Sequence, residues 1–172
     1  MAMKFYVICG WILLACGVAQ AQSRLEAVDV SEFCDLVRKA DSYHEKTVRI
    51  KTTYVVGSES SIVADPDCMG ISGEGAVWVK FDSYFKYWSK SEVVKRFDQL
   101  LHATPKKADG STVPVTARGL EVVFVGKFET HRRFGHLNSY SHQLTVYAIE
   151  AVKPISWMVN GEKYFTTWPD TP

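Results

Sequence analysis

One short segment, residues 131–142, concentrates side chains that could do chemistry. It holds three of the five histidines in the chain, two arginines and two aromatic residues. Arginine guanidiniums bind anions through paired hydrogen bonds, and an aromatic ring offers a stacking face. Segments that join strands carry binding residues more often than the strands themselves do. We therefore predict an anion or sugar site formed by His131, Arg132, Arg133, His136, Tyr140 and His142.

The same segment admits two other interpretations. A metal site could use its three imidazoles, His131, His136 and His142. Their spacing differs from the pattern of helical zinc sites, and Glu129 is the only carboxylate close in sequence. Alternatively, Gly135 permits a tight turn, His136 and Asn138 hydrogen-bond the backbone, and the charges are hydrated. We predict no metal ion and no cofactor.

A second group of candidate binding residues occupies alternating positions of predicted strands. Arg49, Lys51, Trp78 and Lys80 would all point outward. Cations beside an aromatic ring suit ligands that stack, such as sugars or bases. A formal net charge of +1 does not favour nucleic acid, so a protein or a glycan is the expected partner. A hydrated sheet face is the other interpretation of these residues.

Motifs specific for catalysis are missing from the sequence. A nucleophile elbow, a P-loop, an HExxH pair and a CxxC pair are all absent. The residues therefore favour binding over catalysis, and we assign no catalytic residue.

Strand patterns dominate the chain. Residues 47–57, TVRIKTTYVVG, alternate between an apolar face with Val48, Ile50 and Tyr54 and a mostly polar face. Further strands are predicted over residues 60–64, 76–81, 120–128 and 143–152. A terminal hairpin is predicted over residues 156–165, because Asn160-Gly161 is a strong two-residue turn signal.

Two of these strands carry more detailed expectations. Gly126 predicts a bulge or sharp bend in the strand over residues 120–128. In the strand over residues 143–152, strict alternation places Leu144, Val146 and Ala148 on one face. The same alternation places Tyr147 and Ile149 on the other face.

Two helices are predicted among the strands. The first has an apolar stripe of Phe33, Leu36, Val37 and Ala40. Asp29 or Ser31 would cap it, and Asp29 with Glu32 matches a capping box. The second follows Ser91 and ends before Pro105, with apolar residues at helical spacing: Val93, Val94, Phe97, Leu100 and Leu101.

A helix between the third and fourth of five strands is the element order of the OB-fold, a small partly open barrel. We therefore predict a mainly β, α+β fold: a five-stranded OB-fold-like barrel with an N-terminal helix, a helix between strands three and four, and a C-terminal hairpin. Residues 22–172 would form this single domain. An unrelated small β-barrel with helices is the alternative.

Residues 1–21 are typical of a secretory signal peptide. Lys4 precedes a nearly continuous apolar stretch, and Ala19-Gln20-Ala21 matches a cleavage site. Leu13-Leu14-Ala15-Cys16 also resembles a lipobox, so lipid anchoring through Cys16 is an alternative, and the only one that predicts membrane association.

Export would leave Cys34 and Cys68 as an even pair in an oxidising compartment, which predicts a disulfide. Closing a loop of about 35 residues would stabilise the fold by about 3–4 kcal/mol. Two separate buried thiols are the alternative.

Several short stretches together resemble a set of small exported bacterial proteins. They are Cys34 in the first helix, V-R-I-K-T-T-Y at 48–54, D-P-D-C at 65–68, V-W-V at 77–79, V-G-K-F-E at 125–129, F-G-H-L-N-S-Y at 134–140 and Q-L-T-V at 143–146. The resemblance covers most of the chain after residue 21. It implies an OB-fold-like domain and export, and it carries no catalytic residue.

Together these features predict an exported, non-enzymatic binding or interaction module whose ligand is a protein or an envelope glycan. A periplasmic hydrolase or metal-dependent enzyme using residues 131–142 is one alternative. A lipid-anchored envelope protein is the other.

Overall fold

The structure is a computed structural model, and it describes residues 26–57, 59–65, 68, 75–83, 91–103, 117–159 and 162–165. For residues 117, 118, 156–159 and 162–165 the backbone alone is described. The predicted signal segment and Cys16 lie outside these residues.

The strand β2 (Thr47–Gly57) is the centre of the fold. Its residues alternate as predicted, because Val48, Ile50 and Tyr54 are buried and Lys51 is exposed. It pairs along its full length with β5 (Ala117–Glu129) and over its last third with β3 (Ser61–Ala64). Both partners are antiparallel to β2.

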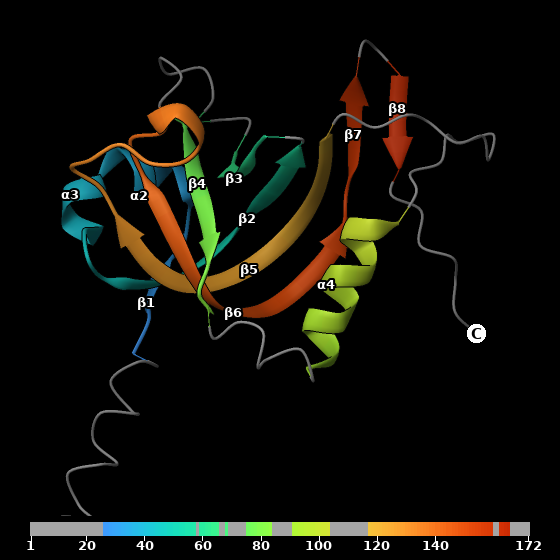
Figure 1. The fold of residues 1–172 in the computed structure, drawn as a ribbon. Coiled ribbons are helices and arrows are strands. Elements are labelled where there is room, and N and C mark those ends of the chain that lie inside the picture. The colour runs from blue at the N-terminus through green and yellow to red at the C-terminus, as the bar shows by residue number, and fades with distance from the viewer. Residues whose placement is uncertain are drawn as a thin grey trace, which may run out of the picture.

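The barrel closes through five strands. β3 pairs with β4 (Ala76–Phe81), β4 runs parallel to β6 (Gln143–Pro154), and β6 pairs with β5, which returns to β2. Figure 1 shows β5 and β6 curving together along the barrel, with α4 (Glu92–His102) at one end. Five strands in this order, with a helix between the third and the fourth, confirm the predicted OB-fold-like architecture.

The N-terminal part differs from the prediction. Residues Val28–Val30 form a short strand, β1, parallel to the start of β2, which the sequence pattern did not predict. Asp29 does not cap the following helix, because it lies in β1 and its carboxylate accepts from Arg49 Nη1 at 2.9 Å. The helix α2 (Phe33–Arg38) begins after Glu32 without a side-chain cap, and α3 (Ala40–Tyr43) follows. The predicted capping box is therefore wrong.

Two register shifts bend β6 against β5. They fall between Val123 and Phe124 and between Val125 and Gly126, which confirms the irregularity predicted at Gly126. A Cβ at Gly126 would overlap the backbone carbonyl of Thr145, so only glycine allows this approach.

The same shifts overturn the predicted faces of β6. Leu144 and Val146 are buried, as expected, but so are Ile149 and Val152. Each shift inserts an extra residue and moves the inward side chains by one position. Ile149 therefore joins the core, although strict alternation placed it on the opposite face.

The core lies inside the barrel and under α4. Phe97 of α4 packs against Tyr54 and Phe124, with ring centroids 5.5 Å and 6.0 Å away. Val94 and Leu100 are buried beside it, so the helical spacing read from the sequence is confirmed. Ser91 is at the N-cap position, although its side chain makes no capping bond.

The Cys34–Cys68 disulfide ties α2 to the segment that follows β3, with the two Cα atoms 5.5 Å apart. This confirms the predicted pairing. None of the helices in the described part of the chain is long and apolar enough to cross a membrane.

The predicted terminal hairpin is present as a separate two-stranded sheet of β7 (Ser156–Val159) and β8 (Glu162–Phe165). Its turn residues, 160 and 161, lie outside the described residues.

Candidate ligand-binding site

Residues 131–142, which we call the β5–β6 loop, fold back on themselves. Phe134 and Tyr140 pair through two backbone hydrogen bonds of 2.8 Å and 3.2 Å, and this closes a small turn between them. Phe134 is buried but lies outside the main core cluster, and the Arg132 guanidinium lies 4.9 Å from its ring centroid. The loop therefore has a cation–π contact of its own.

Trp78 of β4 packs against this loop. Its ring packs against Tyr140 with centroids 5.3 Å apart. Gly135 adopts φ +71°, and a Cβ at that position would lie 2.6 Å from the Trp78 ring and 2.7 Å from Tyr140. Glycine is needed there for both reasons, since it tolerates positive φ and lets the backbone approach the indole.

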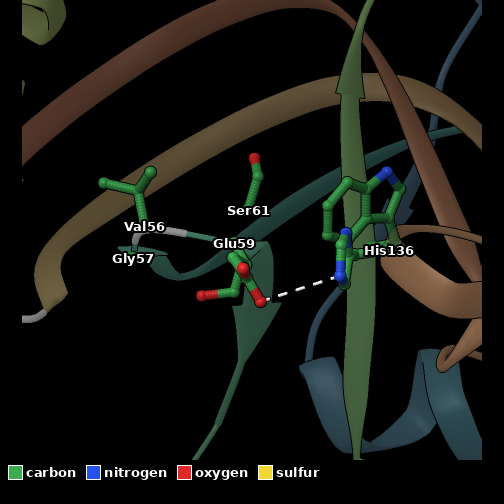
Figure 2. Close-up of a pocket in the computed structure, with 7 residues that line it drawn as sticks. Val56, Gly57, Glu59, Ser61 and His136 are labelled. Atoms are coloured by element: carbon green, nitrogen blue, oxygen red, sulfur yellow. Dashed lines mark ion pairs between the residues drawn. The ribbon is translucent and has the colours of Figure 1, made fainter.

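A pocket of about 400 Å³ opens beside this contact. Its lining comes from the end of β2, the β2–β3 connection, one residue each of β3 and β4, and the β5–β6 loop: Val56, Gly57, Glu59, Ser60, Ser61, Trp78 and His136. Figure 2 shows Glu59 and His136 facing each other across it. Their Oε2 and Nε2 atoms are 3.6 Å apart, an ion pair when the imidazole is protonated.

The chemistry of this pocket suits a polar ligand with an apolar face. It offers part of an indole ring, a carboxylate, an imidazole and serine hydroxyls, one of which, Ser61 Oγ, lies 2.9 Å from the Tyr54 hydroxyl.

The pocket also lies at a characteristic position in the fold. β3 and β4 are the second and third strands of the barrel. OB-folds bind oligonucleotides and oligosaccharides on the face of those strands, between the loops after the first and the fourth strand. The pocket occupies that position.

The three histidines of the loop do not converge. His136 lines the pocket, whereas His131 Nε2 lies 3.6 Å from Asp41 Oδ1 with its ring against His44. His142 is buried, with Nδ1 3.0 Å from the Thr130 hydroxyl.

A metal centre built from all three histidines therefore lacks the geometry. Among the described residues, the one group of potential ligands close enough to share an ion is Cys34, Asp65 and Cys68, and its cysteines form the disulfide.

The two arginines stabilise the loop through hydrogen bonds to Glu129 of β5 and to the loop itself. Arg132 Nη2 donates to Glu129 Oε1 at 2.8 Å. Arg133 donates from Nε to the Asn138 carbonyl at 3.0 Å and from Nη1 to Ser141 Oγ at 3.1 Å. The predicted anion-binding groups thus hold the loop in shape, and Tyr140 does so through Trp78.

The four residues predicted to form one sheet surface lie in two separate regions of the barrel. Arg49 pairs with Glu150 of β6 at 2.9 Å and with Asp29 at 2.9 Å, and the hydrogen bonds to these carboxylates raise its pKa. Lys51 pairs with Glu121 of β5 at 3.2 Å. Both therefore lie over β5 and β6, whereas Trp78 lines the pocket, and Lys80 is exposed two residues further along β4.

A buried carboxylate anchors the loop at its root. Glu129 Oε2 accepts from Gln143 Nε2 at 3.0 Å and from Thr145 Oγ1 at 3.2 Å, while Lys127 lies 3.4 Å from Oε1. Burial acts to raise the pKa of Glu129, but these hydrogen bonds and the Lys127 charge outweigh it and hold the pKa below its usual value.

Sequence reasoning missed Glu59, Ser61 and the role of Glu129. Glu59 and Ser61 can be recognised as site residues only once the fold places the β2–β3 connection beside the β5–β6 loop.

In comparisons with known proteins, no family model, no curated protein and no solved structure matches the chain significantly. The assignment of a binding site therefore depends on the geometry of this chain alone.

Proposed function

We propose that this protein is an exported, non-enzymatic binding module that holds a glycan in the pocket between β3, β4 and the β5–β6 loop. The observation that carries the proposal is the placement of the Trp78 ring beside the Glu59 carboxylate and the Ser61 hydroxyl. A sugar ring presents an apolar face that packs on an indole, and its hydroxyls donate to a carboxylate. The pocket volume of about 400 Å³ lies within the range of small-ligand sites.

Charge argues against nucleic acid in this pocket. Glu59 would face a phosphate, and His136, across from it, carries a positive charge only when its imidazole is protonated. Arg49 and Lys51 have carboxylate partners over other strands. Phosphate binding needs a row of available cations, which the pocket lining does not supply.

A protein partner is the second candidate, and one residue favours it. Leu137 is 82% exposed at the tip of the loop, and its backbone has a positive φ of 52°. The left-handed conformation costs a residue with a side chain about 1–2 kcal/mol. Arg133, which has no carboxylate partner among the described residues, holds the next peptide. Leu137 beside the charge of Arg133 would therefore fit a partner protein that has an apolar pocket surrounded by acidic residues.

Export is part of the proposal. The disulfide between Cys34 and Cys68 fits an oxidising compartment, in line with the predicted signal segment. Mass spectrometry of the mature N-terminus separates plain export from lipid anchoring, because a chain beginning at Gln22 has lost Cys16.

The experiment is a screen of defined oligosaccharides, followed by calorimetric and NMR titration of the best binder. We expect amide shifts to gather on the residues that line the pocket. Glu59→Gln should weaken binding about tenfold, the loss of one good hydrogen bond to a charged group. Glu92→Gln, which changes an exposed carboxylate on α4, is the matched control and should leave affinity unchanged.

Two results would contradict the glycan proposal. One is a screen without binders. The other is a binder whose amide shifts lie away from the pocket or whose affinity is insensitive to Glu59→Gln.

A further inference from the structure

Thr130, the residue between β5 and the β5–β6 loop, is held by two histidines. Its backbone N–H donates to His44 Nδ1 at 3.1 Å, and its hydroxyl lies 3.0 Å from His142 Nδ1. Thr130 is 8% exposed, so water cannot readily replace either partner. His44 lies between α3 and β2, far from the loop in sequence. This contact therefore fastens the residue just before the loop to the body of the barrel.

The contact fixes the tautomer of the neutral His44 ring. A backbone N–H can only donate, so Nδ1 must present its lone pair, and the proton of the neutral ring must be on Nε2. A second proton would go to Nδ1 and turn the acceptor into a donor. The buried Thr130 N–H would then lose its partner.

Charged or titratable residues lie on each segment near this ring. They are Asp41, Glu45 and Lys46 on its own segment, His131 and His142 on the loop, and Lys127 and Glu129 on β5. The His131 ring lies edge-on to His44 with centroids 4.6 Å apart. When both rings are charged they repel each other, whereas Asp41 attracts His131 and Glu45 is already paired with Lys127 at 2.9 Å.

We propose that His44 is a pH-sensitive latch on the binding pocket. Its neutral ring holds Thr130, and through it the loop that carries His136 to the pocket and Tyr140 onto Trp78. Protonation releases that hold. The contact exists while the ring is neutral, and it is lost as the pH falls and the ring takes up a second proton. The effect on ligand binding rests on the proposed function, while the effect on the loop does not.

The latch can be tested on the free protein by NMR. We expect the amide shifts of Thr130 and Gly135 to change together with the His44 ring as the solution is acidified, and the hydrogen exchange protection of Thr130 to fall. His44→Asn keeps an acceptor oxygen near the position of Nδ1 but takes up no proton. In that variant the Thr130 amide should stay protected throughout.

His102→Asn is the matched control. It removes an exposed histidine of α4, whose Nδ1 lies 2.8 Å from the Asp98 carbonyl, and should leave the titration of the loop unchanged. The proposal is overturned when the loop amides do not change as the solution is acidified. It is also overturned when they titrate equally in His44→Asn, which would assign the effect to His131 or His142.

A second measurement addresses regulation. The affinity for an oligosaccharide identified in the screen should fall about tenfold between the neutral and the protonated state in the natural protein, and remain constant in His44→Asn. If no oligosaccharide binds at any pH while the loop amides still respond through His44, the glycan proposal fails and the latch stands. If affinity is the same at both pH values although the loop responds, the latch does not regulate the pocket.

Discussion

Replacement of Glu129 by alanine would test whether the root of the β5–β6 loop is held by one buried carboxylate. In the native fold this carboxylate accepts hydrogen bonds from Gln143, Thr145 and Arg132 at 3.0, 3.2 and 2.8 Å. Its side chain is 8% exposed. Alanine would leave the buried Gln143 amide without its charged acceptor and would remove the attraction to Lys127.

The expected loss follows from these contacts. A hydrogen bond to a charged group contributes about 1.5–3 kcal/mol, and a buried polar group left without a partner costs about 1–3 kcal/mol. Three such bonds do not add fully, and the desolvation of the carboxylate offsets part of their sum. We expect Glu129→Ala to lower the free energy of unfolding by about 3 kcal/mol at neutral pH.

The loss should depend on pH in one direction. The pKa of Glu129 is lower in the folded protein than its usual value. The unfolded carboxyl titrates near about pH 4.3. The stabilisation is therefore fully present above that value and is lost as the pH falls through the lower folded pKa. The difference between the natural protein and the variant should shrink in acid.

Urea unfolding followed by tryptophan fluorescence, at several pH values, measures this difference. Glu121→Gln is the matched control on the same strand, because Glu121 forms a more exposed pair with Lys51. Such surface pairs contribute about 0–1 kcal/mol. The reasoning is refuted when Glu129→Ala loses no more stability than Glu121→Gln at neutral pH, or when its loss is the same in acid.

Two further predictions concern the barrel and its covalent link. Gly126→Ala should destabilise the fold by about 2 kcal/mol or more in the same urea assay, because its Cβ would overlap the Thr145 carbonyl where β5 and β6 shift register; unchanged stability would mean that the strands have room to separate. Replacing both Cys34 and Cys68 by serine should lower stability by about 3–4 kcal/mol. Reducing agent should cause a similar loss in the natural protein and none in the double variant, and equal sensitivity of both would contradict a stabilising disulfide.

Much of the fold could be predicted because its signals are local. Alternating burial in β2 and helical spacing in α4 each depend on residues a few positions apart in the chain. The order of the elements follows once each has been located in the sequence. The faces of β6 could not be predicted, because the two register shifts arise from the strand opposite. β1 was missed for a similar reason, since three residues make a strand only when β2 lies beside them.

The candidate site was predicted in part. The sequence marked His136, Tyr140 and Trp78, and in the structure Trp78 lines the pocket with His136 and packs against Tyr140. It grouped them with Arg132, which instead holds the loop through Glu129, and with Arg49, whose partner Glu150 is 101 residues away in the chain. An unpaired cation and a paired one look alike in a sequence.

The amino-acid sequence by itself determined the strand and helix pattern, the OB-fold order and the cysteines available for a disulfide. These follow from the periodicity of apolar side chains and from the count of thiols. Only the tertiary structure decided which polar groups face the pocket and which neutralise each other. Burial and charge pairing depend on residues that the barrel brings together from distant parts of the chain, so Glu59 meets His136 only after β2, β4 and β6 have taken their places.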